Sequence, residues 1–183
     1  MTIRTRATLA LLSTLVATPV LLHGQAAALR APEPKWLGWD AGTATVTFHL
    51  IAGAMGAKSP FNFNGYTDGE FTLVVPENAT VVMDFVNEDG VPHSAELIRA
   101  DIPIPNSSGE PAIPRAYTRK AMEGMNQGET DVMRFKAAPA GSYRIFCGVP
   151  GHGVSGMWVG FDVRAGVTEP AMEVGPGKGT SGR

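Results

Sequence analysis

Apolar and polar residues alternate in seven short segments of the chain, and this pattern limits the possible folds more than any other feature. In residues 43–52, for example, Val46, Phe48 and Leu50 fall on one face of an extended chain, with polar residues between them. A period of two is typical of strands with one buried face, and turn residues separate the segments, so the pattern predicts an all-β sandwich. The seven segments are residues 43–52, 71–75, 81–85, 93–99, 131–136, 143–147 and 157–164.

The first 28 residues differ from the rest of the chain. Arg4 and Arg6 precede an apolar run over residues 7–22, and small residues follow as far as Ala28. This order is typical of a secretory signal peptide, with an uncleaved N-terminal anchor as the alternative. In both cases we expect an exported domain, periplasmic or otherwise extracytoplasmic, with possible membrane association through the N-terminus.

The remaining residues divide into three parts. We expect a proline-rich linker over residues 29–35, one domain over residues 36–168, and a flexible glycine-rich tail over residues 169–183. Within the domain, residues 101–128 carry four prolines and break the alternation, which predicts a long loop insertion. No cluster of basic residues stands out, which argues against a nucleic-acid partner.

Cys147 is the only cysteine of the chain, and a histidine and a methionine follow it at regular intervals. Four residues separate Cys147 from His152, and four separate His152 from Met157; His93 lies 54 residues upstream of the cysteine. Exported proteins usually pair their cysteines, so a single one indicates an intermolecular bridge or a special thiol such as a metal ligand.

This ligand set favours copper. Thiolate and thioether are soft donors, and two His, one Cys and a weak Met form the set of a blue-copper electron-transfer centre. A zinc site with one Cys and two His, or a catalytic cysteine with a histidine partner, is a weaker alternative, because structural zinc prefers four strong ligands and no cysteine-hydrolase motif surrounds Cys147. The sequence therefore predicts one copper ion bound by His93, Cys147, His152 and Met157.

The loop from Cys147 to Trp158, with its sequence CGVPGHGVSGMW, resembles the copper loop of the sulfocyanins, a cupredoxin family related to rusticyanin. Further similar motifs are FNFNG at residues 61–65, LVVP at 73–76 and PHS at 92–94, and the resemblance covers roughly residues 36–165. It implies an eight-stranded Greek-key sandwich with one type 1 copper, in which His93, Cys147 and His152 are equatorial ligands and Met157 is axial.

The resemblance also implies a function. The chain would be a one-electron carrier and not an enzyme, passing electrons between exported respiratory redox proteins such as cytochromes and a terminal oxidase. Ser94, which matches the rusticyanin branch, and Pro150, which has no N–H, would leave few hydrogen bonds to the thiolate and raise the reduction potential. A copper chaperone or storage protein, or an accessory domain of a copper oxidase or reductase, is the alternative. Apolar residues around His152, namely Val149, Pro150 and Val154, would form the docking patch.

Overall fold

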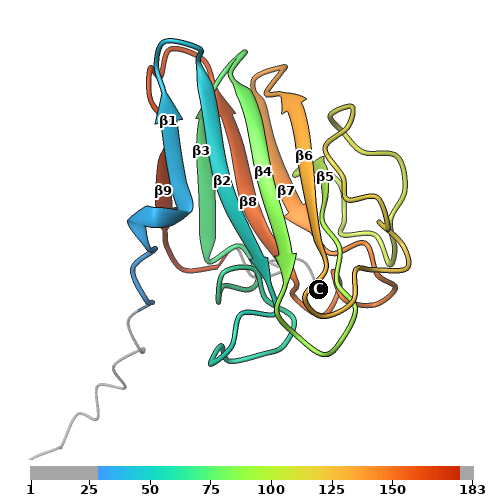
Figure 1. Cartoon of the computed structure of the whole chain (residues 1–183). Coiled ribbons are helices and arrows are strands. Elements are labelled where there is room, and N and C mark those ends of the chain that lie inside the picture. Colours follow the sequence, from blue (N-terminus) through green and yellow to red (C-terminus); the bar gives the residue numbers. More distant parts are fainter. Residues whose placement is uncertain (1–28, 178–183) are drawn as a thin grey trace, which may run out of the picture.

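Two β-sheets packed face to face make up the body of the protein (Figure 1), in a computed structural model that describes residues 29–177. Over that range, nine strands are present: one sheet has the order β1-β2-β4-β6 and the other β5-β7-β8-β3-β9. The elements are the 3-10 helix η1 (Pro34–Trp36), β1 (Leu37–Asp40), β2 (Thr45–Ala52), β3 (Phe71–Pro76), β4 (Thr80–Asn87), β5 (Glu96–Arg99), β6 (Thr130–Lys136), β7 (Gly141–Phe146), β8 (Trp158–Arg164) and β9 (Ala171–Val174).

The order of the strands confirms the predicted sandwich. Strands β2 to β7 alternate between the two sheets, so their connections cross from one layer to the other at the ends of the molecule. Two pairs of neighbouring strands are parallel, namely β2 with β4 and β3 with β8. In each pair, the chain between the two partners includes at least one strand of the opposite sheet, which returns it to the same end of the sheet. The other pairs are antiparallel.

The alternating residues meet between the sheets and form the core. On β4 the side chains of Val81, Met83 and Phe85 are buried, whereas those between them are half-buried. A second, smaller cluster of Ile98, Phe146 and Trp158 lies apart from this core. Trp158 therefore packs on a different layer from its neighbours, as the alternation predicted.

Several predicted boundaries were wrong. The resemblance implied eight strands, and the sequence pattern missed the short strands β1 and β9. The segment expected as a flexible tail from residue 169 instead contains β9, whose residues pair with β3 from Phe71↔Val174 to Val74↔Ala171. The expected linker 29–35 includes the start of η1, and the strand expected from His93 begins only at Glu96.

The predicted signal peptide or anchor, residues 1–28, and the last residues of the expected tail, 178–183, lie outside the described residues. No helix between residues 29 and 177 has the length and apolar character needed to cross a membrane.

The predicted insertion forms the connection between β5 and β6, beside these two strands in Figure 1. Residues 101–128 contain no helix or strand, only two isolated bridges to the domain, His93↔Met125 and Glu96↔Tyr117. Together with the β4–β5 and β7–β8 loops, part of this segment lies at the lower end of the sandwich in the figure. The predicted ligands belong to these two loops.

Candidate metal centre

Three of the four predicted ligands meet at one end of the sandwich, although they come from different parts of the chain. His93 lies between β4 and β5, Cys147 directly follows β7, and His152 lies in the loop that leads to β8. One ligand atom from each lies within 4.8 Å of the others, and this is the one such cluster found over residues 29–177.

The distances between these atoms fit a single metal ion. His93 Nδ1 is 3.2 Å from His152 Nδ1, and Cys147 Sγ is 4.0 Å and 3.5 Å from the same two nitrogens. Donors bound to one ion at about 2.0 Å (nitrogen) and about 2.3 Å (sulfur) lie about 3.3–3.7 Å apart at tetrahedral to trigonal angles. Both imidazoles therefore present Nδ1, and the soft thiolate in the set favours copper.

Burial favours the neutral forms of the three donors. His93 and Cys147 are fully buried, whereas His152 is half-buried. Burial lowers the pKa of His93, against the opposing effect of Asp89, and lowers that of His152, where the neighbouring His93 adds to the effect. Burial also raises the pKa of the Cys147 thiol. Because a thiolate is costly here without a counter-charge, the pocket favours a cation that compensates it.

Backbone groups limit this cost at the sulfur. The Ser94 amide donates to Cys147 Sγ at 3.4 Å, the Ser94 hydroxyl lies 3.8 Å from it, and the Val149 amide also lowers the pKa of the thiol. The hydroxyl is itself fixed, since it donates to the Ala121 carbonyl at 2.6 Å and accepts from the Gly148 amide at 3.0 Å. The Cys147 sulfur is thus contacted by groups whose own positions are fixed.

Met157 closes the loop at the level of the backbone. Its amide donates to the His152 carbonyl at 3.1 Å, and its carbonyl accepts from the Cys147 amide at 3.0 Å. The residue is fully buried next to both ligands. Its role as the weak fourth ligand remains a prediction.

The insertion braces the ligand loop from outside. The Ser108 amide donates to the Gly148 carbonyl at 2.7 Å, and the Gly151 amide donates to the Asn106 carbonyl at 2.8 Å. The contact at Gly148 is so close that a Cβ there would lie 2.7 Å from both the Ala121 carbonyl oxygen and Ser108 Cβ. A glycine is therefore required at this position, and the copper loop and the insertion form one packed unit.

The family follows from comparison with known proteins. The family model described as the sulfocyanin (SoxE) domain matches residues 32–174. The chain belongs to the sulfocyanin family. Among curated proteins, the sulfocyanin of Sulfolobus acidocaldarius is 27% identical over 133 residues, which cover 69% of this chain and 67% of the relative.

One solved structure, that of reduced rusticyanin, shares this fold. Reduced rusticyanin, determined by NMR, is 25% identical with a TM-score of 0.50, and the match covers 66% of this chain and 77% of rusticyanin. Auracyanin A from Chloroflexus aurantiacus, described as a "blue" copper protein, is 23% identical with a TM-score of 0.48, and the match covers 66% of this chain and 99% of auracyanin A. Family membership and the three-donor cluster together confirm the expectation of a cupredoxin with one copper centre.

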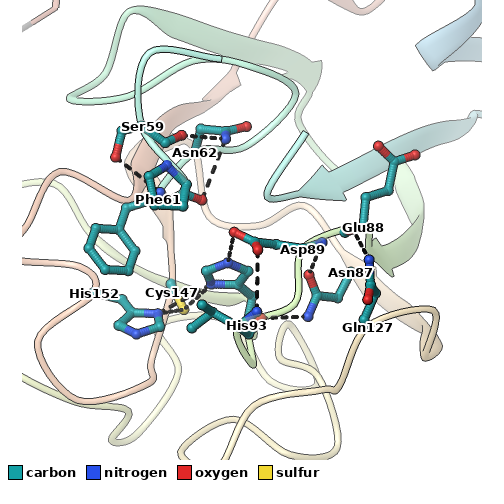
Figure 2. A network of polar contacts seen from close by, with 12 residues as sticks. Ser59, Phe61, Asn62, Asn87, Glu88, Asp89, His93, Gln127, Cys147 and His152 are labelled. Carbon is teal, nitrogen blue, oxygen red and sulfur yellow. Dashed lines mark hydrogen bonds and ion pairs between the residues drawn. The ribbon is translucent and has the colours of Figure 1, made fainter. Parts of the chain in front are cut away.

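Two neighbours of the imidazoles were not predicted as site residues. The ring centroid of Phe61 lies 4.5 Å from that of His152 and 6.3 Å from that of His93, so this half-buried phenylalanine covers both ligands. Figure 2 shows Phe61 and Asp89 near the histidine rings. Phe61 belongs to the FNFNG motif of the resemblance, but nothing in its spacing indicated contact with His152. Asp89 lies in a stretch, NEDG at residues 87–90, that indicated only a turn.

Proposed function

We propose that this protein is a one-electron carrier with a single type 1 copper held by His93, Cys147 and His152, and with Met157 as the weak axial ligand. The observation that carries the proposal is the cluster of two imidazole nitrogens and one thiol sulfur at 3.2–4.0 Å in a buried end of the sandwich. Bound there, copper would supply one-electron chemistry between Cu(I) and Cu(II).

The chain contributes rigidity and exclusion of water. His93 and Cys147 are inaccessible to solvent, the Cys147 amide donates to the Met157 carbonyl, and the Gly148 amide donates to the Ser94 hydroxyl. Donors that keep their positions favour fast electron transfer, because little has to move when the charge of the site changes. The buried environment also disfavours the additional charge of Cu(II), which supports the proposal of a high reduction potential.

Electrons would enter and leave through His152. This ligand is half-buried, and Pro150 and Val154 beside it in the loop are exposed, Val154 to 55%. Exposed apolar side chains around a redox ligand are typical of a transient docking surface. The proposed partners are exported respiratory redox proteins, such as a cytochrome as donor and a terminal oxidase as acceptor, with residues 1–28 directing the chain to the extracytoplasmic side.

The competing function is copper delivery or storage. A chaperone needs a site from which copper exchanges readily, and such sites are open to solvent. Here the His93 side chain and Cys147 have 0% exposure, which favours a permanently held ion and thus the electron carrier. An accessory role in a copper oxidase or reductase would require the chain to function within a larger assembly.

Replacement of Cys147 with serine tests the proposal. The copper-loaded wild type should show an intense visible band from thiolate-to-copper charge transfer, and Cys147→Ser should abolish it with an unchanged far-UV circular dichroism spectrum. His49→Ala is the matched control, because His49 is exposed on β2 and should leave the band intact. A band that persists without the cysteine, or a wild type that loads copper without colour, contradicts the assignment.

A further inference from the structure

Asp89 contacts the buried histidine ligand from the side away from the metal site. Asp89 Oδ2 lies 3.5 Å from His93 Nε2, whereas His93 Nδ1 faces Cys147 and His152 (Figure 2). The His93 side chain is fully buried, but that of Asp89 is 22% exposed. A carboxylate at the edge of the domain therefore reaches inward to a metal ligand that solvent cannot reach.

The position of this carboxylate is fixed by its surroundings. The Asp89 amide donates to Asn87 Oδ1 at 2.9 Å, and the Val91 amide donates to Asp89 Oδ1 at 3.3 Å. The Asn87 side chain in turn donates to the Val91 and Met125 carbonyls, each at 2.8 Å. Asp89 Oδ1 thus accepts a hydrogen bond within the turn, which leaves Oδ2 directed at His93.

Packing from the β2–β3 loop completes the arrangement. A Cβ on Gly53 would lie 2.3 Å from Asp89 Cβ, and Gly53 has a φ of 63°, so only glycine allows this approach. The backbone beyond it is also tied down, because the Glu88 amide donates to the Ala52 carbonyl at 3.0 Å. These contacts hold Asp89 in a fixed position beside His93, unlike a mobile acid on the surface.

The chemistry of the contact is directional. A carboxylate only accepts hydrogen bonds, so it favours the imidazole tautomer with the proton on Nε2 and the lone pair on Nδ1, the nitrogen that faces Cys147. A carboxylate partner also makes a histidine ligand more basic, which stabilises the more highly charged metal ion. His152 is different, because no hydrogen bond to its Nε2 is found among residues 29–177.

We propose that Asp89 is a positioning residue that fixes the metal-binding tautomer of His93 and stabilises Cu(II), so that it holds the reduction potential below the value that burial alone would give. The second part rests on the proposed electron-carrier function. The first part concerns the metal-free protein and can be tested without copper.

The first test measures the tautomer directly. Nitrogen NMR of the histidine rings in the metal-free wild type should place the neutral His93 proton on Nε2. In Asp89→Asn, where the amide can also donate, Nδ1–H should become populated. A wild type with the proton on Nδ1 overturns the proposal whether or not the chain carries electrons, since copper is absent from the measurement.

The second test measures the potential by redox titration of the copper-loaded protein. Asp89→Asn should favour Cu(I) by about tenfold, which is about 59 mV for one electron. Glu88→Gln is the matched control: it removes the same charge from the adjacent, exposed residue of the same turn. Equal shifts of the reduction potential in the two variants would mean that Asp89 acts only through its charge, and would refute its role through His93. Failure of the wild type to bind copper would instead refute the electron-carrier function alone.

Discussion

Replacement of Ser94 with alanine should destabilise the metal-free protein by about 3 kcal/mol, although only one oxygen atom is lost. Ser94 is fully buried, and its hydroxyl joins three segments of the chain. It donates to the Ala121 carbonyl of the insertion at 2.6 Å and accepts from the Gly148 amide of the ligand loop at 3.0 Å. The same change therefore removes the link between the β4–β5 loop, the insertion and the ligand loop.

The magnitude follows from the two backbone groups that lose their partner. A buried group without a hydrogen bond costs about 1–3 kcal/mol. Gly148 is buried, so its amide should cost about 2 kcal/mol, and Ala121 is half-buried, so its carbonyl, which water can reach more easily, should cost about 1 kcal/mol. The missing oxygen leaves too small a cavity to add much to this sum.

Urea unfolding of the metal-free protein measures the effect without the added stability that a bound ion would give. Ser155→Ala is the control, because the Ser155 hydroxyl donates to the Gly151 carbonyl at 2.7 Å in the same loop but is exposed to water. It should change the free energy of unfolding by less than about 0.5 kcal/mol. If Ser94→Ala is no more destabilising than this control, the buried hydroxyl does not fasten the loop and the reasoning fails.

Three further predictions concern acid stability, the axial ligand and docking. Burial raises the pKa of Glu96 above its ordinary 4.5, so the folded state favours the protonated acid, and the free energy of unfolding should fall as the pH rises through and above 4.5. Glu96→Gln should therefore be more stable than the wild type at pH 7 but not at pH 3. Urea unfolding of the metal-free protein measures both effects. Met157→Leu should keep the visible band but favour Cu(I), because a weak axial donor to Cu(II) is lost; disappearance of the band would mean a stronger role for the thioether. Val154→Asp places a charge on a side chain that is 55% exposed beside His152. It should slow electron transfer with a cytochrome, measured by stopped flow, by at least about tenfold at an unchanged reduction potential. An unchanged rate would mean that docking takes place elsewhere.

The strands with a buried face could be predicted from the sequence, and two short edge strands, β1 and β9, could not. β4 alternates fully buried and half-buried side chains because both its neighbours and the facing sheet surround it. β1 and β9 lie at the edges of their sheets, each has four residues, and each alternates only between exposed and half-buried. Strands with little burial leave a weak pattern, so the residues of β9 resembled a flexible tail.

The cluster of His93, Cys147 and His152 was predictable for a different reason. Cys147 and His152 lie five residues apart in one loop, so a short motif contains the chemistry, and rare residue types draw attention to it. Phe61 and Asp89 act through contacts that depend on how the β2–β3 and β4–β5 loops pack against each other. Phenylalanine and aspartate are common residues in such loops, and neither has a spacing that distinguishes a ligand neighbour from an ordinary loop residue.

The insertion explains how a glycine-rich loop can hold a metal without regular secondary structure. Residues 147–157 contain four glycines that would leave an isolated loop flexible. In the insertion, the Asn106 carbonyl accepts a hydrogen bond from the Gly151 amide, and the Ser108 amide donates one to the Gly148 carbonyl. Met125 of the insertion exchanges two backbone hydrogen bonds with His93, at 3.1 Å and 2.7 Å. Two of the segments that carry ligands are therefore fastened to the same third segment. Because this bracing is independent of the ion, the donors should keep their spacing as the charge of the site changes, which is what an electron carrier requires.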